Sequence, residues 1–381
     1  MSQESYGAGI LTLYPSLEDL KTNLDVDIQI LQDEIYELTE TMLQHDYNNC
    51  AKYFSYNLQN KRKKNQDVCN EPLFSNVKQK LWSVDTLRKL VALHDNYEPN
   101  PLIIENVTKK ELDEEIDFLA SCFNTTVMNL LCAFFIKHKL IKSKLYWREI
   151  FRELWFKRWT SDGSCAFEHV FLGELGSRGS RVNGVHNWVF FLLQERSNKL
   201  NYYGFDQALD FGKNKKGDSR GGIITSSFEW NENGWKYMKS YSGMFIGFSP
   251  EMELALFTLA YLLNPGGALS ISLGGSKLEI QTHVSDNSLH SAYPRILEER
   301  HQLNEIVSTN AVGKLRFFCR TKRFGFIRIL DTQEDVFVHS SEMWPHLRYA
   351  KPGYLFTFKI KIGLKGNIAF DIKRANSKKV S

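Results

Sequence analysis

Apolar residues recur at helical spacing in several stretches of the chain. Within residues 31–43 the apolar positions lie about one turn apart, which predicts a helix that contains Ile35, Leu38 and Met42. A second helix is expected after Thr108-Lys109-Lys110-Glu111, which has the spacing of a capping box. We expect its buried face to be formed by Leu112, Ile116, Leu119 and Phe123. Further helices are predicted for residues 127–134 and 147–159.

The middle of the chain alternates strand-like and helical patterns. Short runs rich in β-branched and aromatic residues, separated by Gly, Asn and Asp, predict strands at residues 202–205, 223–230 and 235–239. A helix follows, for which Ser249 is a suitable N-cap, Pro250 suits the first position, and Asn264-Pro265-Gly266 supplies the end. These elements predict an α+β domain over residues 28–305, after an N-terminal extension at residues 1–27.

Two histidines lie in apolar runs on either side of a glycine-containing connection. His169 belongs to the run Glu168-His169-Val170-Phe171-Leu172-Gly173-Glu174, and His186 belongs to Asn183-Gly184-Val185-His186-Asn187-Trp188. We expect the β-like apolar residues beside them, Val170-Phe171 and Val189-Phe190-Phe191, to form strands of a hairpin, whose tight return is allowed by Gly176, Gly179 and Gly184. Imidazole exchanges protons near neutral pH, so two histidines in one cleft suit the cleavage of an RNA phosphodiester by its own 2′-hydroxyl.

Composition restricts the class of protein and the cellular compartment in which we expect it. The 381 residues exceed the usual size of a single core, and 43% hydrophobic with 13% aromatic content is sufficient for packed globular domains. The sequence has neither a signal-peptide pattern nor a long uncharged apolar stretch. We therefore expect a protein that is not secreted and has no membrane partner, located in the cytoplasm or alternatively in the nucleus. Six cysteines without Cys-x-x-Cys spacing fit buried free thiols and argue against a structural zinc site.

The net charge of +4 is unevenly distributed along the chain. Residues 311–381 contain 15 Lys and Arg against 5 Asp and Glu, whereas the first 310 residues are net negative. The C-terminal segment is therefore the part suited to a polyanion. A separate basic run, Lys61-Arg62-Lys63-Lys64, has three open interpretations: a solvated loop, a surface that contacts RNA, or a localisation signal.

A series of short motifs, in this order, resembles the poly(U)-specific endoribonuclease family, also called EndoU or XendoU. Beyond the two histidine motifs, the resemblance rests on Leu31-Gln32-Asp33-Glu34, Asp46-Tyr47-Asn48, Leu81-Trp82, Asp95-Asn96-Tyr97-Glu98, Thr126-Val127-Met128, Phe245-Ile246-Gly247-Phe248-Ser249-Pro250-Glu251 and Ser291-Ala292-Tyr293. It covers about seven tenths of the chain. The resemblance implies an EndoU-like α+β nuclease fold. It also implies an enzyme that cleaves single-stranded, U-rich RNA at uridylates and leaves 2′,3′-cyclic phosphate ends.

The same resemblance implies roles for individual residues. His186 is expected to be the general base, and His169 the general acid. Lys239, six residues before the Phe of Phe-Ile-Gly, is expected to stabilise the charge that develops on the phosphorus centre. Lys236 is a nearby rival that does not match this spacing. Three other histidines lack such a motif and are interpreted as structural: His283, His290 and His301.

Other residues of this chain match positions of the family pattern, and an alternative interpretation of each remains open. Glu168 and Glu174 are expected to support the histidines, unless they are exposed strand glutamates. Ser291 and Tyr293 are candidates for uracil recognition, unless the tyrosine only packs in a strand. The family often has Gly-Ser-x-Phe where this chain has Ser242-Gly243-Met244-Phe245, which leaves the role of Ser242 undecided. Several family members resemble manganese-dependent enzymes, which makes Mn²⁺ a candidate stimulatory ion, with metal ligands unknown.

From Gly313 onward the sequence alternates aromatic and cationic residues. Alternation places Phe324 and Phe326 on one face of a strand, where aromatic rings bordered by Lys and Arg form a stacking platform for unpaired bases. Residues 311–375 resemble a cold-shock domain, a small all-β barrel of the OB type, and residues 376–381 form a basic tail. The positions that stack on bases in that family correspond to Phe317, Phe324, Phe326, Phe337 and His339. Lys314, Arg316 and Lys322 are the expected phosphate contacts.

These observations predict a uridylate-specific endoribonuclease whose C-terminal module captures the RNA substrate. We expect a monomer whose partner is single-stranded, U-rich RNA. The rival hypothesis is a regulatory RNA-binding protein whose nuclease domain has lost activity, which the presence of His169, His186 and Lys239 argues against. A cold-shock-like protein that acts on DNA is a third alternative, because aromatic platforms accept either backbone.

Overall fold

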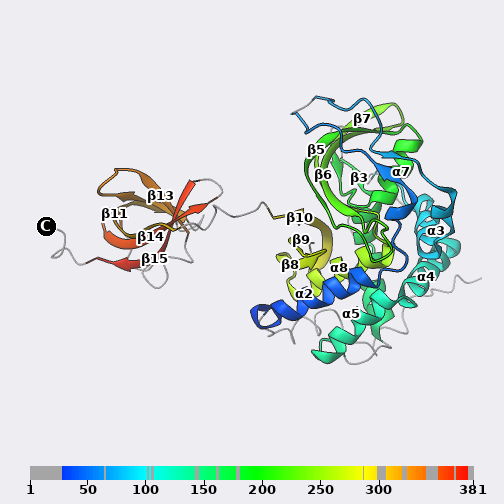
Figure 1. Cartoon of the computed structure of the whole chain (residues 1–381), viewed down its shortest axis with the longest axis horizontal. Coiled ribbons are helices and arrows are strands. Elements are labelled where there is room, and N and C mark those ends of the chain that lie inside the picture. Colours follow the sequence, from blue (N-terminus) through cyan, green and yellow to red (C-terminus); the bar gives the residue numbers. More distant parts are fainter. Residues whose placement is uncertain are drawn as a thin grey trace, which may run out of the picture. The chain divides into compact units, whose positions relative to one another are not determined.

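The computed structural model describes residues 28–63, 66–100, 103, 107–141, 146–159, 163–176, 181–285, 287–297, 306–319, 324–339, 351–363 and 366–375. The chain divides into two compact units between Ile296 and Leu297, and Figure 1 labels their helices and strands. Helices and antiparallel sheets make up the first unit, and a closed barrel makes up the second. The predicted α+β class followed by an all-β barrel is confirmed. The predicted extension and tail, residues 1–27 and 376–381, lie outside the described ranges.

The first unit contains the helices α2 (Ile28–Gln44), α3 (Asp85–Ala92), α4 (Lys109–Phe123), α5 (Thr126–Lys137), α6 (Trp147–Phe156), α7 (Trp188–Arg196) and α8 (Pro250–Leu263), with short 3₁₀ turns η1 (Ala51–Tyr53), η2 (Gln79–Ser83) and η3 (Leu93–Asp95). Helices α4, α5, α7 and α8 begin at a side-chain cap. Thr108 and Glu111 form the expected capping box of α4. The Ser249 hydroxyl accepts a hydrogen bond from the Met252 amide at the start of α8. The helices predicted from apolar spacing and caps are therefore confirmed.

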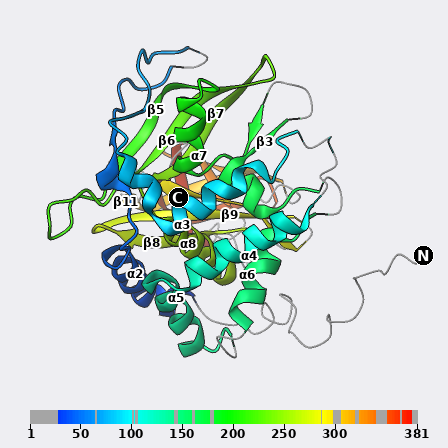
Figure 2. The ribbon, with the colours of Figure 1, turned by 90° about the vertical axis from the view of Figure 1, so that its right-hand side faces the viewer.

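Helix α8 is the centre of the first unit. All of its 14 residues are buried, and it contacts α2, α3, α4 and α5 as well as strands β9 and β10. Figure 2 shows α8 between this group of helices and the β8–β9 strands. Apart from Glu251, Glu253 and Thr258 the helix is apolar on every side, and such a helix is stable only when it is surrounded, so its composition explains its central place.

The buried face of α4 differs from the prediction. Leu112 is 37% exposed and Ile116 is 52% exposed, whereas Phe118 is fully buried. The reason is a buried carboxylate: Glu115 accepts a hydrogen bond from the Tyr97 hydroxyl at 2.9 Å and lies 3.3 Å from Arg158. Because these partners satisfy Glu115 inside the protein, the helix can turn this polar position toward the core.

Two three-stranded antiparallel sheets form the frame of the site. The first has the order β5 (Leu200–Asp210), β6 (Gly222–Glu232), β7 (Trp235–Ile246), and the second has the order β10 (Ser288–Ile296), β9 (Ser276–Ser285), β8 (Ala268–Leu273). Strands at the three predicted positions are confirmed, and they extend further than predicted. Strand β10 contacts all three strands of the first sheet. At Gly243 of β7 the approach is so close that a Cβ would lie 2.3 Å from the Pro294 carbonyl oxygen. A shorter ribbon pairs β1 (Ser55–Tyr56) with β2 (Phe74–Ser75).

The second unit is a closed five-stranded barrel. Its strands are β11 (Ile306–Cys319), β12 (Phe324–Ile329), β13 (Asp335–His339), β14 (Leu355–Gly363) and β15 (Gly366–Arg374), in the order β11-β12-β13-β15-β14. Alternate residues of β12 and β13 fill the interior, among them Ile327, Val336 and Val338. Closure removes the sheet edges that would otherwise pair with other chains.

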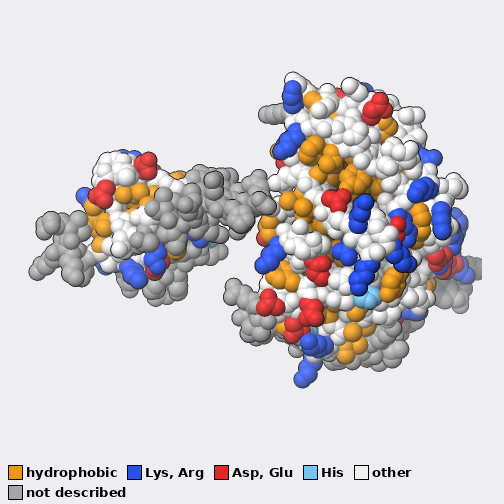
Figure 3. Space-filling model, in the orientation of Figure 1, with side chains coloured by type: hydrophobic (Ala, Val, Ile, Leu, Met, Phe, Trp, Pro, Cys, Tyr) orange, Lys and Arg blue, Asp and Glu red, His pale blue; other side chains and the backbone are white. Residues whose placement is uncertain are grey.

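Surface charge on the first unit is mixed. Lys and Arg are interspersed with Asp and Glu on the face in Figure 3. Five of the six cysteines are buried, as expected: Cys50, Cys69, Cys122, Cys132 and Cys165. Among the described helices, none is by itself long and apolar enough to cross a membrane. The pair α4 and α5 passes that test together but is bent by 79°.

The basic run at residues 61–64 is only partly a solvated loop. Lys61 and Lys63 are exposed, and Lys64 lies outside the described residues. The guanidinium of Arg62, in contrast, lies 3.7 Å from the centre of the Tyr241 ring and 3.5 Å from the Asp206 carboxylate. Arg62 therefore attaches this loop to the first sheet.

Candidate active site

The apolar residues beside the two histidines, 170–171 and 189–191, are helical, so the strands predicted for them are wrong. His169 lies in a single π-helical turn, η5 (Glu168–Leu172), and His186 lies two residues before α7. The Asn187 side chain caps α7 by accepting hydrogen bonds from the amides of Val189 and Phe190. Short apolar runs do not distinguish a buried strand from a buried helix, which is why the pattern was misleading. π-helical turns are rare and often occur at functional sites.

A short antiparallel ribbon nevertheless joins the two histidine segments, although residues 177–180, which include Gly179 of the expected return, lie outside the described residues. Strands β3 (Glu174–Leu175) and β4 (Val182–Asn183) pair as a two-residue ribbon. Beyond it, the Val185 amide donates to the His169 carbonyl at 3.2 Å. Gly184 has a φ of +63°, and a Cβ there would lie 1.6 Å from the His169 carbonyl oxygen. Only glycine allows the two histidine backbones to approach this closely.

His169 is oriented by a buried carboxylate. Its Nδ1 lies 3.1 Å from Glu174 Oε2, and the Ser164 hydroxyl donates a short hydrogen bond to the other oxygen of Glu174. Burial would raise the pKa of Glu174, but the hydrogen bond and charge of His169, with the bond from Ser164, lower it below its usual value. An ionised Glu174 accepts a hydrogen bond from the Nδ1–H group, which leaves Nε2 as the nitrogen that exchanges a proton.

His186 has a different environment. Its Nδ1 lies 3.0 Å from the Gly243 carbonyl oxygen and 3.4 Å from the Ser242 hydroxyl, which itself donates to the Val185 carbonyl. Because a carbonyl only accepts, Nδ1 carries the proton and Nε2 carries the lone pair. Burial, followed by the charges of Lys239 and His169, lowers the pKa of His186 well below its usual value. His186 is therefore neutral at pH 7, and Ser242 helps to fix its position.

Lys239 supplies a positive charge that acts on His186. It lies on β7 opposite Phe228 of β6 and is half-buried. Burial lowers its pKa to about 8, and the charge of Glu174 acts in the opposite direction. Lys236, the rival position, is exposed and lies 2.8 Å from the Glu229 carboxylate. Lys239 rather than Lys236 thus interacts electrostatically with His186 and Glu174.

Two histidines that the sequence analysis interpreted as structural lie in the site. The His290 ring lies 4.6 Å from the His169 ring and stacks on Trp159 at 4.5 Å. His283 Nε2 lies 3.1 Å from the Tyr293 hydroxyl. His290 lies on β10, the strand that carries the Ser291-x-Tyr293 motif, and its proximity in sequence was the available signal; His283 lies opposite Ser291 on the neighbouring strand β9. His301 lies outside the described residues.

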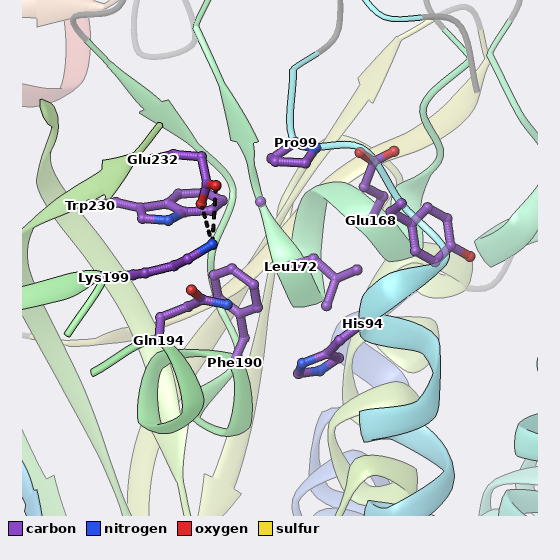
Figure 4. A pocket seen from close by; sticks show the side chains of 11 residues that line it. His94, Pro99, Glu168, Leu172, Phe190, Gln194, Lys199, Trp230 and Glu232 are labelled. Carbon is purple, nitrogen blue, oxygen red and sulfur yellow. Dashed lines mark hydrogen bonds and ion pairs between the residues drawn. The ribbon is translucent and has the colours of Figure 1, made fainter. Parts of the chain in front are cut away.

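The remaining predicted residues divide between the site and its surroundings. Tyr293 stacks on His186 with ring centres 4.9 Å apart, and Ser291 is only 5% exposed. Glu168 and Glu174 are both buried, so exposed strand glutamates are excluded. Glu168 lines a separate pocket together with Leu172 (Figure 4). The two glutamates therefore do not form a common ligand set, and within the described ranges no cluster of three or more His, Cys, Asp or Glu could hold a metal.

On the barrel, the predicted aromatic residues come together. Phe324 and Phe326 share the outer face of β12, with Phe317 opposite Phe326 on β11 and Phe337 opposite Phe326 on β13. Neighbouring ring centres are 5.6 to 6.2 Å apart, and Phe317 is 45% exposed. His339 is exposed opposite Phe324. We call these five side chains the aromatic platform.

The cationic residues predicted to contact phosphate beside the platform differ in their exposure and ion pairing. Lys314 is exposed on β11. Arg316 lies 3.4 Å from Asp335, which also forms an ion pair with Arg328. Lys322 lies outside the described residues. Lys314 is thus available to a phosphate, whereas Arg316 would have to share its charge with Asp335.

Comparison with known proteins gives consistent matches. The family model "Endoribonuclease XendoU" matches residues 34–294, and the model "'Cold-shock' DNA-binding domain" matches residues 311–375. Uridylate-specific endoribonuclease D of Xenopus laevis is 31% identical, covering 71% of this chain and 92% of that protein. The uridylate-specific endoribonuclease of Homo sapiens is 32% identical, covering 68% and 63%. The solved structure of XendoU, a splicing-independent snoRNA-processing endoribonuclease, is 27% identical with a TM-score of 0.58, covering 70% of this chain and 97% of that chain.

Proposed function

Because this chain belongs to the endoribonuclease XendoU family, we propose that it cleaves single-stranded RNA at uridylates through attack by the substrate's own 2′-oxygen. The similar proteins of Xenopus laevis and Homo sapiens are named uridylate-specific, which supports this base preference. The observation that carries the proposal is the pair of buried histidines with different partners: His169 contacts the Glu174 carboxylate, whereas His186 contacts the Gly243 carbonyl and has a lowered pKa. Opposed environments for two titratable groups are typical of an acid and base pair.

His186 is the proposed general base. A base must be unprotonated before it can act, and the lowered pKa of His186 meets this requirement at neutral pH. The Gly243 carbonyl fixes the proton on Nδ1, so Nε2 accepts the proton of the 2′-hydroxyl. The oxygen then attacks the adjacent phosphorus, and a 2′,3′-cyclic phosphate forms as the 5′-oxygen leaves.

His169 is the proposed general acid. It must carry a proton on Nε2 to donate to the leaving 5′-oxygen, and the ionised Glu174 compensates the charge of that imidazolium. Lys239 would stabilise the additional negative charge on the phosphate oxygens in the transition state. Each of these steps uses only side chains of this protein.

Manganese is proposed only as a stimulatory ion. Because the Glu168 and Glu174 carboxylates do not converge on one point, no step of the proposed reaction uses the metal. Comparing cleavage rates in EDTA and in added Mn²⁺ tests the stimulation.

The barrel is proposed to capture the RNA. Its aromatic platform would stack on unpaired bases and raise the concentration of substrate at the nuclease domain. We propose that the protein acts as a monomer in the cytoplasm or nucleus. Light scattering and cell fractionation test these two points.

The experiment that tests the chemistry compares two oligonucleotides. One contains a single ribouridine in a deoxy strand, and its control is the all-deoxy strand. We expect cleavage only after the ribouridine, with a 2′,3′-cyclic phosphate on the 5′ fragment by mass spectrometry. Cleavage of the all-deoxy strand, or a linear phosphate from the earliest time point, would show that water is the nucleophile and refute the proposal.

A further inference from the structure

The His290 side chain comes from an irregular point of its strand. The pairing of β10 with β9 shifts by one residue: Leu289 lies opposite Val284, and Ser291 lies opposite His283. Two residues of β10, His290 and Ser291, therefore occupy the space opposite one residue of β9. Such a β-bulge redirects a side chain, and bulges are over-represented next to active sites. The bulge thus gives His290 a direction that the regular alternation of a strand would not give it.

His290 contacts two other rings of the site. Its ring centre lies 4.6 Å from that of His169, with an angle of 44° between the planes, and 4.5 Å from that of Trp159, with an angle of 27°. The ring centres of Trp159 and His169 are 6.3 Å apart. Rings attract one another at centre distances of about 4.5 to 7 Å. His169 is buried and the other two are half-buried, so the three rings form one packed group.

Trp159 is also connected to the carboxylate that orients His169. Its backbone amide donates a hydrogen bond to the Ser164 carbonyl at 2.7 Å. The Ser164 hydroxyl donates to one oxygen of Glu174, and the other oxygen lies 3.1 Å from His169 Nδ1. Together with the ring contacts, these bonds close a circuit that begins and ends at His169 and passes through Glu174, Ser164, Trp159 and His290.

The two kinds of contact fix different parts of the His169 imidazole. The hydrogen bond to Glu174 sets the position of Nδ1 but allows the ring to tilt about that bond. The contact with the His290 ring restricts the tilt, because packed side chains leave few voids into which a ring can move. With Nδ1 and the ring plane both set, the direction of Nε2 is determined.

We propose that His290, supported by Trp159, is a positioning residue for the general acid: its ring holds the His169 imidazole with Nε2 directed at the leaving 5′-oxygen. The inference rests on the proposed function of His169 and assigns no proton transfer to His290 itself. A misplacement of about 1 Å can lower a rate about 10²-fold. Because Glu174 still holds Nδ1 when the His290 ring is removed, we expect a smaller loss, of about tenfold.

Two substrates with different leaving groups test this role. In the dinucleotide UpA the leaving adenosine 5′-oxygen needs a proton, whereas in uridine 3′-(4-nitrophenyl phosphate) the phenolate leaves without one. In single-turnover assays of the full-length protein, His290→Ala should slow UpA cleavage about tenfold and keep cleavage of the nitrophenyl ester within about twofold of wild type. His290→Phe keeps a ring but cannot transfer a proton, and it should restore the UpA rate.

His138→Ala is the matched control. His138 is also half-buried, and its ring centre lies 4.6 Å from that of Phe134, but it belongs to the C-terminal end of α5 rather than to the site. This variant also loses a packed histidine ring. It should cleave both substrates at the wild-type rates.

The outcomes separate the inference from the function on which it rests. Unchanged UpA cleavage in His290→Ala, or equal losses on both substrates, would overturn the positioning role. A UpA rate as low in His290→Phe as in His290→Ala would also overturn it, since the ring alone would then be insufficient. His169→Ala should slow UpA far more than the nitrophenyl ester. If it slows both equally, or if the wild type cleaves neither, the assignment of His169 as the acid is wrong, and the inference fails with it.

Discussion

Gly184→Ala should disable the site without removing any functional group. The alanine Cβ would lie 1.6 Å from the His169 carbonyl oxygen, whereas ordinary contacts are 3.4 Å or more, so the two backbones must separate by almost 2 Å. The φ of +63° adds a cost of about 1 to 2 kcal/mol for a residue with a Cβ. Overpacking adds about 1 to 3 kcal/mol, which gives a loss of roughly 2 to 5 kcal/mol in the free energy of unfolding.

The effect on catalysis should be larger than this loss suggests. A displacement of about 1 Å between reacting groups can lower a rate about 10²-fold, and here the displaced segments carry both the acid and the base. We therefore expect single-turnover cleavage of oligouridylate at saturating protein to fall about 10²-fold or more in the folded variant. Urea titration gives the stability, and circular dichroism checks that the variant is folded in the assay.

Gly234→Ala is the matched control. Gly234 lies in the turn between β6 and β7 with a φ of +81°, and an added Cβ would meet nothing within 4 Å. This variant should lose only about 1 to 2 kcal/mol from backbone strain and keep its cleavage rate. Equal cleavage rates for the two variants would refute the argument that close approach at Gly184 positions the histidines.

Three further predictions concern proton transfer, charge and RNA capture. His169→Ala and His186→Ala should each lower single-turnover cleavage by at least about 10²-fold while RNA binding persists, and near wild-type rates in both would remove the proposed acid and base. Because burial lowers the pKa of Lys239 to about 8, its positive charge is present below that pH and lost above it. The wild-type cleavage rate should therefore decline as the pH rises through 8. The Lys239→Arg variant should keep its positive charge and therefore its rate over this range. An identical alkaline decline in the pH–rate profiles of both proteins would assign the effect to another group. Replacing Phe324 and Phe326 together by Ala should weaken binding of short single-stranded RNA by roughly 2 to 6 kcal/mol in a titration, and unchanged affinity would contradict the aromatic platform.

Much of the local structure was determined by the sequence alone. Ser249 and Pro250 start a helix because a hydroxyl cap and a fixed φ act within one turn of chain. Phe324 and Phe326 share a face because the two-residue period of a strand holds in any barrel. The order of the motifs also indicated the family, since the residues that perform the chemistry are identified by type and spacing.

Other features were decided only by tertiary structure. The apolar runs beside His169 and His186 are helical and buried, and a short run that is apolar throughout lacks the polar positions whose period would distinguish a helix from a strand. Glu168 and Glu174 belong to one motif, but Glu168 lines a pocket whereas Glu174 contacts His169, since the intervening π-helical turn sets their directions. His290 reaches His169 from a strand more than a hundred residues later in the chain. A sequence pattern specifies periodicity within an element, whereas the pKa of His186 and the pairing of His169 depend on groups that only the folded chain brings together.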